Sequence, residues 1–407
     1  MKGFMKILTI ALVLMLTAFP FGGNGANANE DPTIYLKGNA KEIGKQYGKL
    51  AKEEIQQNIT LFKQTAAAIQ LDMDYAETTA TYENFLRNEN PEQLDQLKAM
   101  AESADVSYDD LLAFNALGED VLAEGCTTVL ANGEATKSGS AFYHKNRDAM
   151  RGAAQVVVQV EPENGEKFIG ITSAGYTGIA MGINEHGVSV GNNVLDTWDR
   201  GPGYGNLDVI RLALENAEGA ADAVAFIKEI PRSSGSNYGI ADSDEAAFVE
   251  ATHTATAVKW VEDEVMVHTN HYILDGMEQY EALDMDNLED NDWSWYVSTE
   301  ERLSRATHLM EQATGKIDAQ TLIKLSEDQD GQDSTYWIDS QAEINGIPMG
   351  TVSTGTFDGS KERMWGQLGQ PSVAPAIPFD VDRPHIPDPF SSGKQSDRMK
   401  ETTANRN

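Results

Sequence analysis

The sequence of 407 residues contains one cysteine, Cys126, so it cannot form an intramolecular disulfide. It is also poor in basic residues, with 31 Lys plus Arg against 64 Asp plus Glu and a formal charge of −33. A field of this sign repels nucleic acids and anionic membranes, so we expect neither as a partner. After the first 19 residues no apolar run approaches the ~20 residues that span a bilayer.

Motifs of several common hydrolases are missing as well. Without a Gly-x-Ser-x-Gly elbow, a Ser-His-Asp hydrolase is disfavoured. The pair His268 and His271 lacks the His-Glu-x-x-His pattern of zinc enzymes. Residues 328–333 resemble a calcium loop but lack a ligand before Gly331 and the distal glutamate, so we interpret them as a solvated acidic loop, with calcium as the alternative. The sequence therefore predicts no metal and no cofactor.

The first 28 residues have the pattern of a secretory signal peptide. Lys2 and Lys6 precede an apolar core at 7–19, and Ala26-Asn27-Ala28 provides a small-x-small cleavage site. Such a segment is removed after Ala28, which predicts a secreted protein, extracellular or in the cell envelope. An uncleaved anchor is the alternative.

The rest of the chain shows helical and strand periodicities in blocks. The segment before Cys126 is expected to be helical throughout, with helices at 40–69, after Pro91 and after the N-cap Ser107. Beyond it, strands are expected at 155–160, 167–172, 177–183 and 188–195, helices at 207–217 and 220–230, strands at 238–241, 246–250, 255–261 and 265–269, and helices at 297–312 and 318–325. This order favours an α+β fold with two stacked antiparallel sheets.

The surroundings of Cys126 favour a reactive thiol over a buried structural one. Gly125 leaves its own carbonyl open to attack by the Cys126 thiol. An N-to-S acyl shift, with water then hydrolysing the thioester, would cut the chain between them. The new α-amine, with a reference pKa near ~8, can take the thiol proton on the same residue. Residues 127–130 and 140–143 flank an Asn132-Gly133 turn signal, so Cys126 is expected to begin a hairpin strand. Asp148 ends the second strand, where its carboxylate would orient the amine.

The Gly-Cys-Thr-Thr-Val motif at 125–129, followed by Asn-x-Asp at 146–148, resembles the isopenicillin-N acyltransferase-like (acyl-coenzyme A:6-aminopenicillanic acid acyltransferase) family of cysteine N-terminal-nucleophile hydrolases. Blocks at 37–48, 100–101, 111–115, 182–188, 192–193, 236–238, 269–272 and 299–302 resemble the family's other blocks in the same order. The resemblance implies a four-layer αββα sandwich and self-cleavage before Cys126.

The resemblance also implies roles for further residues. Asn237 matches the asparagine that stabilises the oxyanion, and Asn193 offers a second donor, although Asn192 beside it leaves the alignment open by one residue. Arg302 matches an arginine that pairs with a carboxylate or binds one on the substrate, with Arg305 as a competitor. In the related choloylglycine hydrolases an arginine precedes the aspartate by a few residues. Lys145 stands there, so that role is not transferred.

These inferences divide the chain into a signal peptide (1–28), a helical pro-segment (29–125), a catalytic domain (126–374) and a Pro-rich, partly disordered tail (375–407). We expect a secreted, self-processed enzyme that hydrolyses a small amide through an acyl-enzyme. Its own pro-segment would be the partner α chain, and a homo-oligomer is possible. Acyl transfer is one alternative function. A noncatalytic extracellular binding protein with uncleaved Cys126 is the other.

Overall fold

The computed structural model describes residues 33–68, 75–122, 125–282, 298–329, 341–344 and 347–382. The predicted signal peptide, the acidic stretch after Gln329 and residues 383–407 of the predicted tail lie outside these ranges. In the described part no helix is long and apolar enough to cross a membrane.

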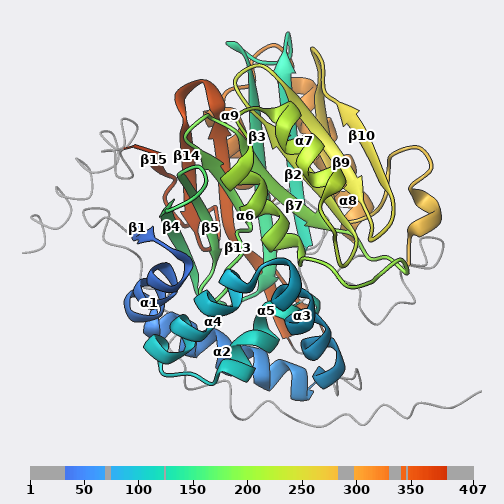
Figure 1. Cartoon of the computed structure of the whole chain (residues 1–407). Coiled ribbons are helices and arrows are strands. Elements are labelled where there is room, and N and C mark those ends of the chain that lie inside the picture. Colours follow the sequence, from blue (N-terminus) through green and yellow to red (C-terminus); the bar gives the residue numbers. More distant parts are fainter. Residues whose placement is uncertain are drawn as a thin grey trace, which may run out of the picture.

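Two stacked β-sheets form the centre of the molecule (Figure 1). Sheet A has the strand order β1-β4-β5-β6-β7-β8-β9-β10, and sheet B has the order β11-β2-β3-β13-β14-β15, with β12 paired to β13. Sheet A consists of β1 (Thr33–Gly38), β4 (Gln155–Pro162), β5 (Phe168–Ser173), β6 (Met181–Asn184), β7 (Ser189–Val194), β8 (Ser236–Ala241), β9 (Ala246–Ala251) and β10 (Thr256–Trp260). Sheet B consists of β11 (Val265–His268), β2 (Gly125–Gly133), β3 (Gly139–Met150), β12 (Gln341–Ile344), β13 (Ile347–Asp358), β14 (Arg363–Leu368) and β15 (Ile377–Asp380).

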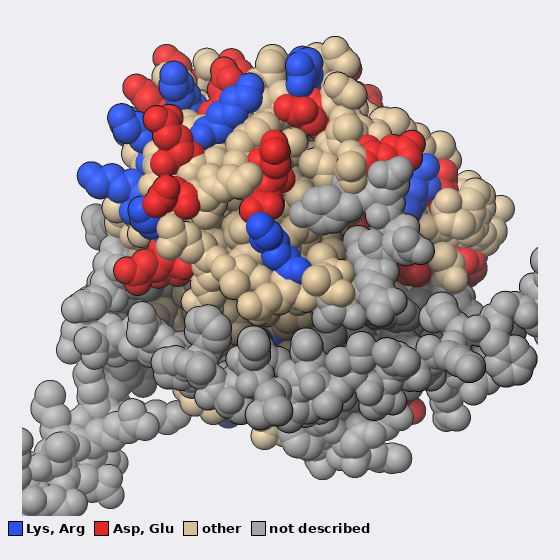
Figure 2. Space-filling model, turned by 90° about the horizontal axis from the view of Figure 1, so that it is seen from below, with Lys and Arg blue, Asp and Glu red and all other residues tan. Residues whose placement is uncertain are grey.

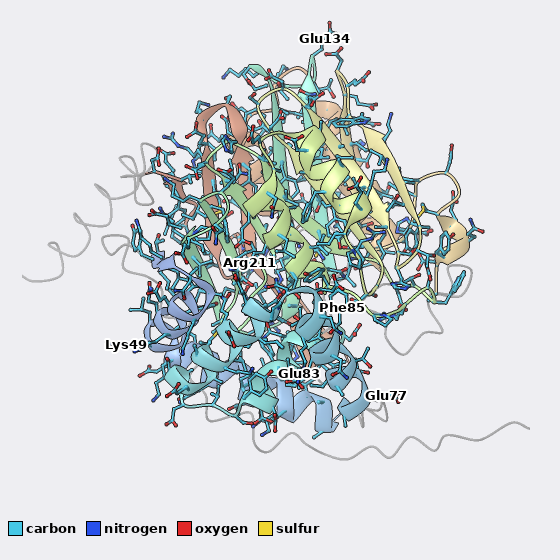
Figure 3. All side chains as sticks on the ribbon, in the orientation of Figure 1. Lys49, Glu77, Glu83, Phe85, Glu134 and Arg211 are labelled. Atoms are coloured by element: carbon cyan, nitrogen blue, oxygen red, sulfur yellow. The ribbon has the colours of Figure 1, made fainter. Side chains whose placement is uncertain are left out.

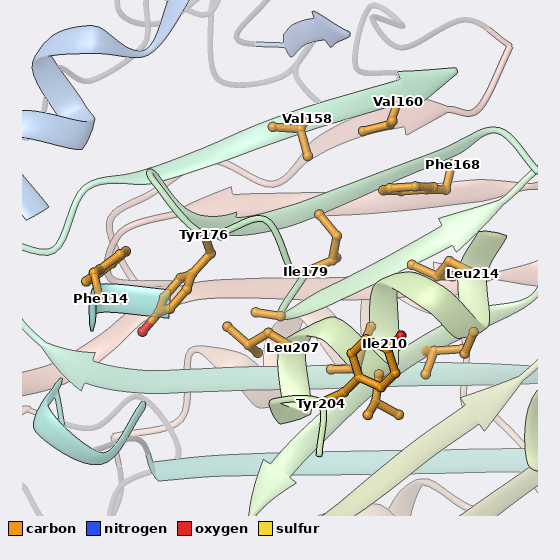
Figure 4. Close-up of a cluster of buried hydrophobic side chains, with 14 of the residues drawn as sticks. Phe114, Val158, Val160, Phe168, Tyr176, Ile179, Tyr204, Leu207, Ile210 and Leu214 are labelled. Carbon is orange, nitrogen blue, oxygen red and sulfur yellow. The ribbon is translucent and has the colours of Figure 1, made fainter. Parts of the chain in front are cut away.

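Helices cover the outer face of each sheet and complete four layers. Helices α6 (Asn206–Asn216) and α7 (Ala220–Glu229) pack on sheet A, and α8 (Thr299–Ala313) and α9 (Ala319–Ser326) pack on sheet B. Figure 4 shows the first of these contacts, in which Leu207, Ile210 and Leu214 of α6 lie against strands of sheet A. Each fully buried side chain of this kind contributes about 1.5–3 kcal/mol. The αββα sandwich that the resemblance implied is confirmed.

Five further helices lie at one end of the sandwich (Figure 1). They are α1 (Ala40–Leu50), α2 (Lys52–Ala68), α3 (Tyr75–Glu89), α4 (Pro91–Ala104) and α5 (Tyr108–Leu122). The helix expected at 40–69 is broken at Ala51, and α3 was not predicted. Ser107 caps α5 as expected, since its hydroxyl accepts the N–H of Asp110 at 3.3 Å.

The expectation that the whole segment before Cys126 is helical was wrong. Residues Thr33–Gly38 form β1, which pairs in parallel with β4 at the edge of sheet A. The strand has a two-residue period, because Leu36 is buried while Tyr35 and Lys37 are exposed. Asn39 then stops the strand and caps α1, and its side chain forms a capping box with Glu42.

The boundary at residue 374 was also wrong, because the ordered domain continues beyond it. Strand β15 pairs with β14, and its Phe379 is 1% exposed in the core between the sheets. Pro378 lies within this strand at the edge of the sheet, a position that tolerates proline because no partner strand needs its missing N–H. Because the region is rich in proline, its sequence did not predict this short strand.

A polar network joins the N-terminal helices to the sandwich. Buried Asp208 of α6 accepts hydrogen bonds from Tyr82 Oη of α3 at 2.6 Å and from Gln93 Nε2 of α4 at 2.7 Å. Burial raises the pKa of Asp208 above its usual value, although these donors oppose the shift. Arg211, labelled in Figure 3, donates to Gln96 of α4 and to the carbonyl of Thr177.

Charged side chains on the surface are mixed in sign despite the excess of acid. Figure 2 shows acidic and basic residues side by side on the face seen from below. One such exposed pair joins Lys63 to Asp110 at 2.7 Å between α2 and α5. Pairs of this kind contribute about 0–1 kcal/mol each, so they are a minor part of stability.

Candidate active site

Cys126 lies at the start of β2, the first strand of the predicted hairpin. Strands β2 and β3 are antiparallel, with Cys126 opposite Arg147 and Gly125 opposite Asp148. The turn between these strands carries Glu134, which lies at the end of the molecule far from the N-terminal helices (Figure 3). Cys126 is therefore at the end of the sandwich that the helices cover.

Alternation along β2 decides which way the thiol points. Val129 packs against the helices outside sheet B, whereas Leu130 packs in the core between the sheets. Residues two apart on a strand share a face, so Cys126 and Thr128 point toward sheet A together with Leu130. On β3, Arg147 and Tyr143 pair with Cys126 and Leu130 and share that face.

The backbone of Cys126 is held on both sides by buried side chains. Its N–H donates to Asn270 Oδ1 at 2.8 Å, and its carbonyl accepts from Arg302 Nη1 at 2.5 Å. Arg302 Nη2 donates to the same Asn270 oxygen at 2.8 Å. Asn270 Nδ2 donates to the carbonyl of Val194 at 3.0 Å, so the orientation of the amide is fixed from both ends.

Arg302, which lies in the first turn of α8, was predicted to bind a carboxylate. Its guanidinium instead donates to the backbone carbonyl of Cys126 and to Asn270 Oδ1, and its Nε donates to Ser298 Oγ at 2.9 Å. This geometry makes it a support for Cys126. Its competitor Arg305, one turn later in α8, pairs with Asp328 at 2.6 Å.

The two predicted asparagines are neighbours on sheet A and face the space between the sheets. Asn193 and Asn237 are register partners on β7 and β8. Asn237 Nδ2 donates to Asn193 Oδ1 at 3.1 Å, and Asn193 Nδ2 donates to the carbonyl of His268 on sheet B at 3.4 Å. Asn192 instead accepts from Lys145 Nζ at 2.9 Å. The structure therefore favours Asn193 over Asn192 as the second site asparagine.

Asn237 keeps hydrogen-bonding capacity that the protein does not use. Its side chain is fully buried, and in the described part of the chain Oδ1 has no hydrogen-bond partner. A primary amide has two N–H groups, and Asn193 takes one of them. A buried polar atom left without a partner costs about 1–3 kcal/mol of stability.

Asp148 and Arg147 lie on β3, opposite Gly125 and Cys126. Asp148 is buried opposite Gly125, and its Oδ1 accepts from Thr351 Oγ1 at 2.6 Å. Arg147 Nη1 donates to Gln155 Oε1 and to Ser173 Oγ, each at 2.9 Å. The predicted Asp148 is thus beside the Gly125–Cys126 peptide bond, and the fully buried guanidinium of Arg147 lies opposite Cys126.

Tyr143 forms the inner side of the site. Its ring lies against Gly191 and Gly239, and a Cβ on Gly191 would be 2.1 Å from Tyr143 Oη, so that glycine is needed for the close approach. Burial raises the pKa of Tyr143 well above its usual value, and the nearby Cys126 adds to the shift. Its hydroxyl therefore stays protonated.

Asn270 and His271 lie in the segment 269–272, which the sequence singled out only as one of the blocks that resemble the family. Asn270 was not predicted as a site residue, although the block at 269–272 contains it. His271 contacts Thr299 Oγ1 at 2.9 Å, and burial, His268 and Arg302 together lower its pKa to about 4. The imidazole is neutral at pH 7. In the described ranges no group of acidic, histidine or cysteine side chains is suited to hold a metal.

Comparison with known protein families gives one match. A family model described as acyl-coenzyme A:6-aminopenicillanic acid acyl-transferase matches residues 135–373. This range contains Asp148, Asn193, Asn237 and Arg302, and Cys126 lies just before it. The chain has no match among curated protein sequences.

Several solved structures are similar to the chain at low identity. A mutant of conjugated bile acid hydrolase from Clostridium perfringens is 12% identical, with a TM-score of 0.43 over 65% of this chain and 94% of that one. A Caenorhabditis elegans ortholog of N-acylethanolamine-hydrolyzing acid amidase is 16% identical, with a TM-score of 0.40 over 57% and 93%. Penicillin V acylase from Agrobacterium tumefaciens is 14% identical, with a TM-score of 0.38 over 62% and 85%.

The family model covers more than half of the sequence. The chain belongs to the acyl-coenzyme A:6-aminopenicillanic acid acyltransferase family, a family of enzymes with the N-terminal-nucleophile hydrolase fold.

Proposed function

We propose that this protein is a secreted amidohydrolase that cuts itself between Gly125 and Cys126 and then uses Cys126 as its nucleophile. The observation that carries this proposal is the hydrogen bond from the Cys126 nitrogen to Asn270 Oδ1 at 2.8 Å, in a cluster completed by Arg302. That nitrogen would become the α-amine after cleavage. It would be held and oriented before the reaction begins, which is what general base catalysis requires.

Each step of the proposed cycle uses a group near this nitrogen. The α-amine takes the thiol proton as Cys126 Sγ bonds to the carbonyl carbon of the amide. The second Nδ2 hydrogen of Asn237 is available for the oxyanion, and such a donor accelerates turnover about 10²–10³-fold. The α-ammonium then protonates the leaving amine as the C–N bond breaks. Water attacks the thioester, gives its proton to the α-amine, and releases the acid and the thiol.

Asp148 and Asn193 act in this scheme by holding other groups. Asp148 lies opposite Gly125 and steadies the junction, while Asn193 fixes the orientation of Asn237. Arg302 adds a positive charge near the amine, which disfavours the protonated form and keeps more of the base free at neutral pH.

Acyl transfer to an amine instead of water uses the same acyl-enzyme, and the family description supports it directly. Hydrolysis is our choice because a secreted enzyme meets little acyl-coenzyme A. A noncatalytic binding protein remains the alternative from another class, with an uncleaved junction.

A denaturing gel with mass spectrometry tests self-cleavage in the purified protein. We expect fragments 29–125 and 126–407 from wild type and a single chain 29–407 from Cys126→Ala. Penicillin V, N-acyl amino acids, acyl-homoserine lactones and small peptides are then incubated with the processed protein, and the released amines are identified by mass. An intact wild-type chain that hydrolyses none of these amides would refute the proposal and favour the binding protein.

A further inference from the structure

A buried acid and histidine pair crosses the space between the two sheets beside the site. Glu250 belongs to β9 of sheet A and His268 to β11 of sheet B, and Glu250 Oε1 lies 2.7 Å from His268 Nε2. Both side chains are fully buried. Glu250 is the register partner of Asn237, and His268 is the partner of Thr128, the next residue after Cys126 on β2 that points into the same space.

Each polar atom of this pair has a hydrogen-bond partner. His268 Nδ1 faces the carbonyl of Thr269 at 2.9 Å, and Nε2 faces the carboxyl of Glu250. That carboxyl also accepts the N–H groups of Ile273 at 2.7 Å and Leu274 at 3.2 Å, as a carboxylate does. A proton on Nδ1 and a second one between Nε2 and the carboxyl group satisfy every polar atom of the pair.

The pair supports the segment that carries Asn270. Glu250 binds the N–H groups of Ile273 and Leu274, so it fixes the chain just after β11. Asn270 lies in this segment, between His268 and these two residues. The position of its amide oxygen at the Cys126 nitrogen therefore depends on a carboxylate on the opposite sheet.

The pair also supports the asparagines of sheet A. The His268 carbonyl accepts from Asn193 Nδ2 at 3.4 Å, and this bond sets which end of the Asn193 amide faces Asn237. The Asn193 oxygen must then accept from Asn237 Nδ2. The backbone carbonyl of His268 thus determines how Asn237 presents its amide group to the site.

We propose that Glu250 and His268 are positioning residues, which hold Asn270 at the Cys126 nitrogen and Asn237 at the site of the oxyanion. This inference rests on the proposed function, because it assumes that Cys126 reacts. Stability alone is a poor explanation of the pair, since a buried ion pair adds little net stability compared with apolar residues of the same volume. The pair does fix one arrangement of strands β7, β9 and β11 around the site.

Two substitutions of Glu250 separate positioning from folding. Glu250→Gln keeps the volume and an oxygen for the Leu274 N–H, so the chain should fold. Its amide nitrogen takes the position of Oε1, where it can donate to a neutral His268 but cannot accept from the Ile273 N–H. Glu250→Asp keeps the charge but shortens the reach by one methylene. The control is Asp380→Asn, which removes the charge from the pair that Asp380 Oδ1 forms with Arg363 Nε at 2.7 Å, at the opposite edge of sheet B.

The measurement is the second-order rate of Cys126 alkylation by iodoacetamide in processed protein, per processed chain, together with the melting temperature. The reagent needs no knowledge of the substrate, and Cys126 is the one thiol in the sequence. We expect alkylation to be about tenfold slower in Glu250→Gln and slower in Glu250→Asp, with melting temperatures near wild type. Asp380→Asn should react at the wild-type rate.

Wild-type alkylation rates in both Glu250 variants would overturn the inference. So would an equal slowing in Asp380→Asn, because the effect would then be a general loss of stability. Failure of the proposed function has a different signature, in which wild-type Cys126 is alkylated normally but no amide is hydrolysed.

Discussion

Replacing Asn270 with aspartate tests whether the Cys126 α-amine is the base. The substitution keeps the volume and the oxygen that accepts from the Cys126 nitrogen at 2.8 Å, and it adds a negative charge there. At about 4 Å and an effective dielectric constant of ~20, that charge would stabilise an ammonium by about 4 kcal/mol. Arg302 donates to the same oxygen at 2.8 Å and offsets much of this. A net effect of about 1.4 kcal/mol raises the pKa of the amine by about one unit.

The sign of the effect follows from the role of the base. A raised pKa keeps the amine protonated to higher pH, and an ammonium cannot accept the thiol proton. The acidic limb of kcat/KM in processed Asn270→Asp should therefore move up by about one pH unit, with a loss of about tenfold on that limb and recovery at high pH. The pH dependence of Cys126 alkylation should move in parallel.

A matched control adds the same charge elsewhere. Asn216 is an exposed residue of α6 whose Nδ2 donates to Leu212, and Asn216→Asp should leave the limb unchanged. An acidic limb that stays in place in Asn270→Asp would refute the α-amine as the base. A uniform loss of activity at every pH would instead assign Asn270 to positioning alone.

Three other outcomes are expected. Cys126→Ser should process slowly and turn over little, because the α-amine is poorly matched to an alcohol, and full activity on the amides screened above would contradict the thiol mechanism. Asn237→Ala should fold but lose about 10²-fold in kcat, as measured by initial rates, and an unchanged kcat would move the oxyanion role to another residue. Burial lowers the pKa of His144 to about 4, so the unfolded chain binds a proton below pH 6.5 that the folded chain does not. Between pH 6.5 and 4, this residue should lower the free energy of unfolding of the wild type by about 3 kcal/mol. Denaturant unfolding at several pH values should show a smaller fall in His144→Gln. Part of the fall should stay in that variant, because the pKa of His271 is also lowered to about 4.

Local patterns predicted most of the elements between Cys126 and Leu325. The hairpin of β2 and β3 and helices α6 to α9 follow from periodicity and turn residues close together in the chain. The cap at Ser107, before this stretch, follows from its local sequence in the same way. Strand β1 was missed because a short strand at a sheet edge carries a weak signal of its own. Its partner β4 lies more than 100 residues away.

The site was predictable where a residue lies near Cys126 in the sequence and less so elsewhere. Asp148 follows from the hairpin register, whereas Asn270 reaches the nucleophile through tertiary packing of β11 against β2. Glu250 is further removed, since its partner lies on the other sheet. No local pattern distinguishes it from an ordinary strand glutamate, and its role depends on how two sheets stack.

Strand β1 gives the proposed cleavage a consequence for solubility. It pairs with β4 from Val157 to Pro162, so the segment before the cut supplies the outermost strand of sheet A. If that fragment left, β4 would present unpaired N–H and C=O groups beside apolar Val158 and Val160. An open, apolar strand edge is a template for pairing with other chains. Dissociation of the fragment should therefore be followed by aggregation of the remainder, which light scattering in mild denaturant would detect.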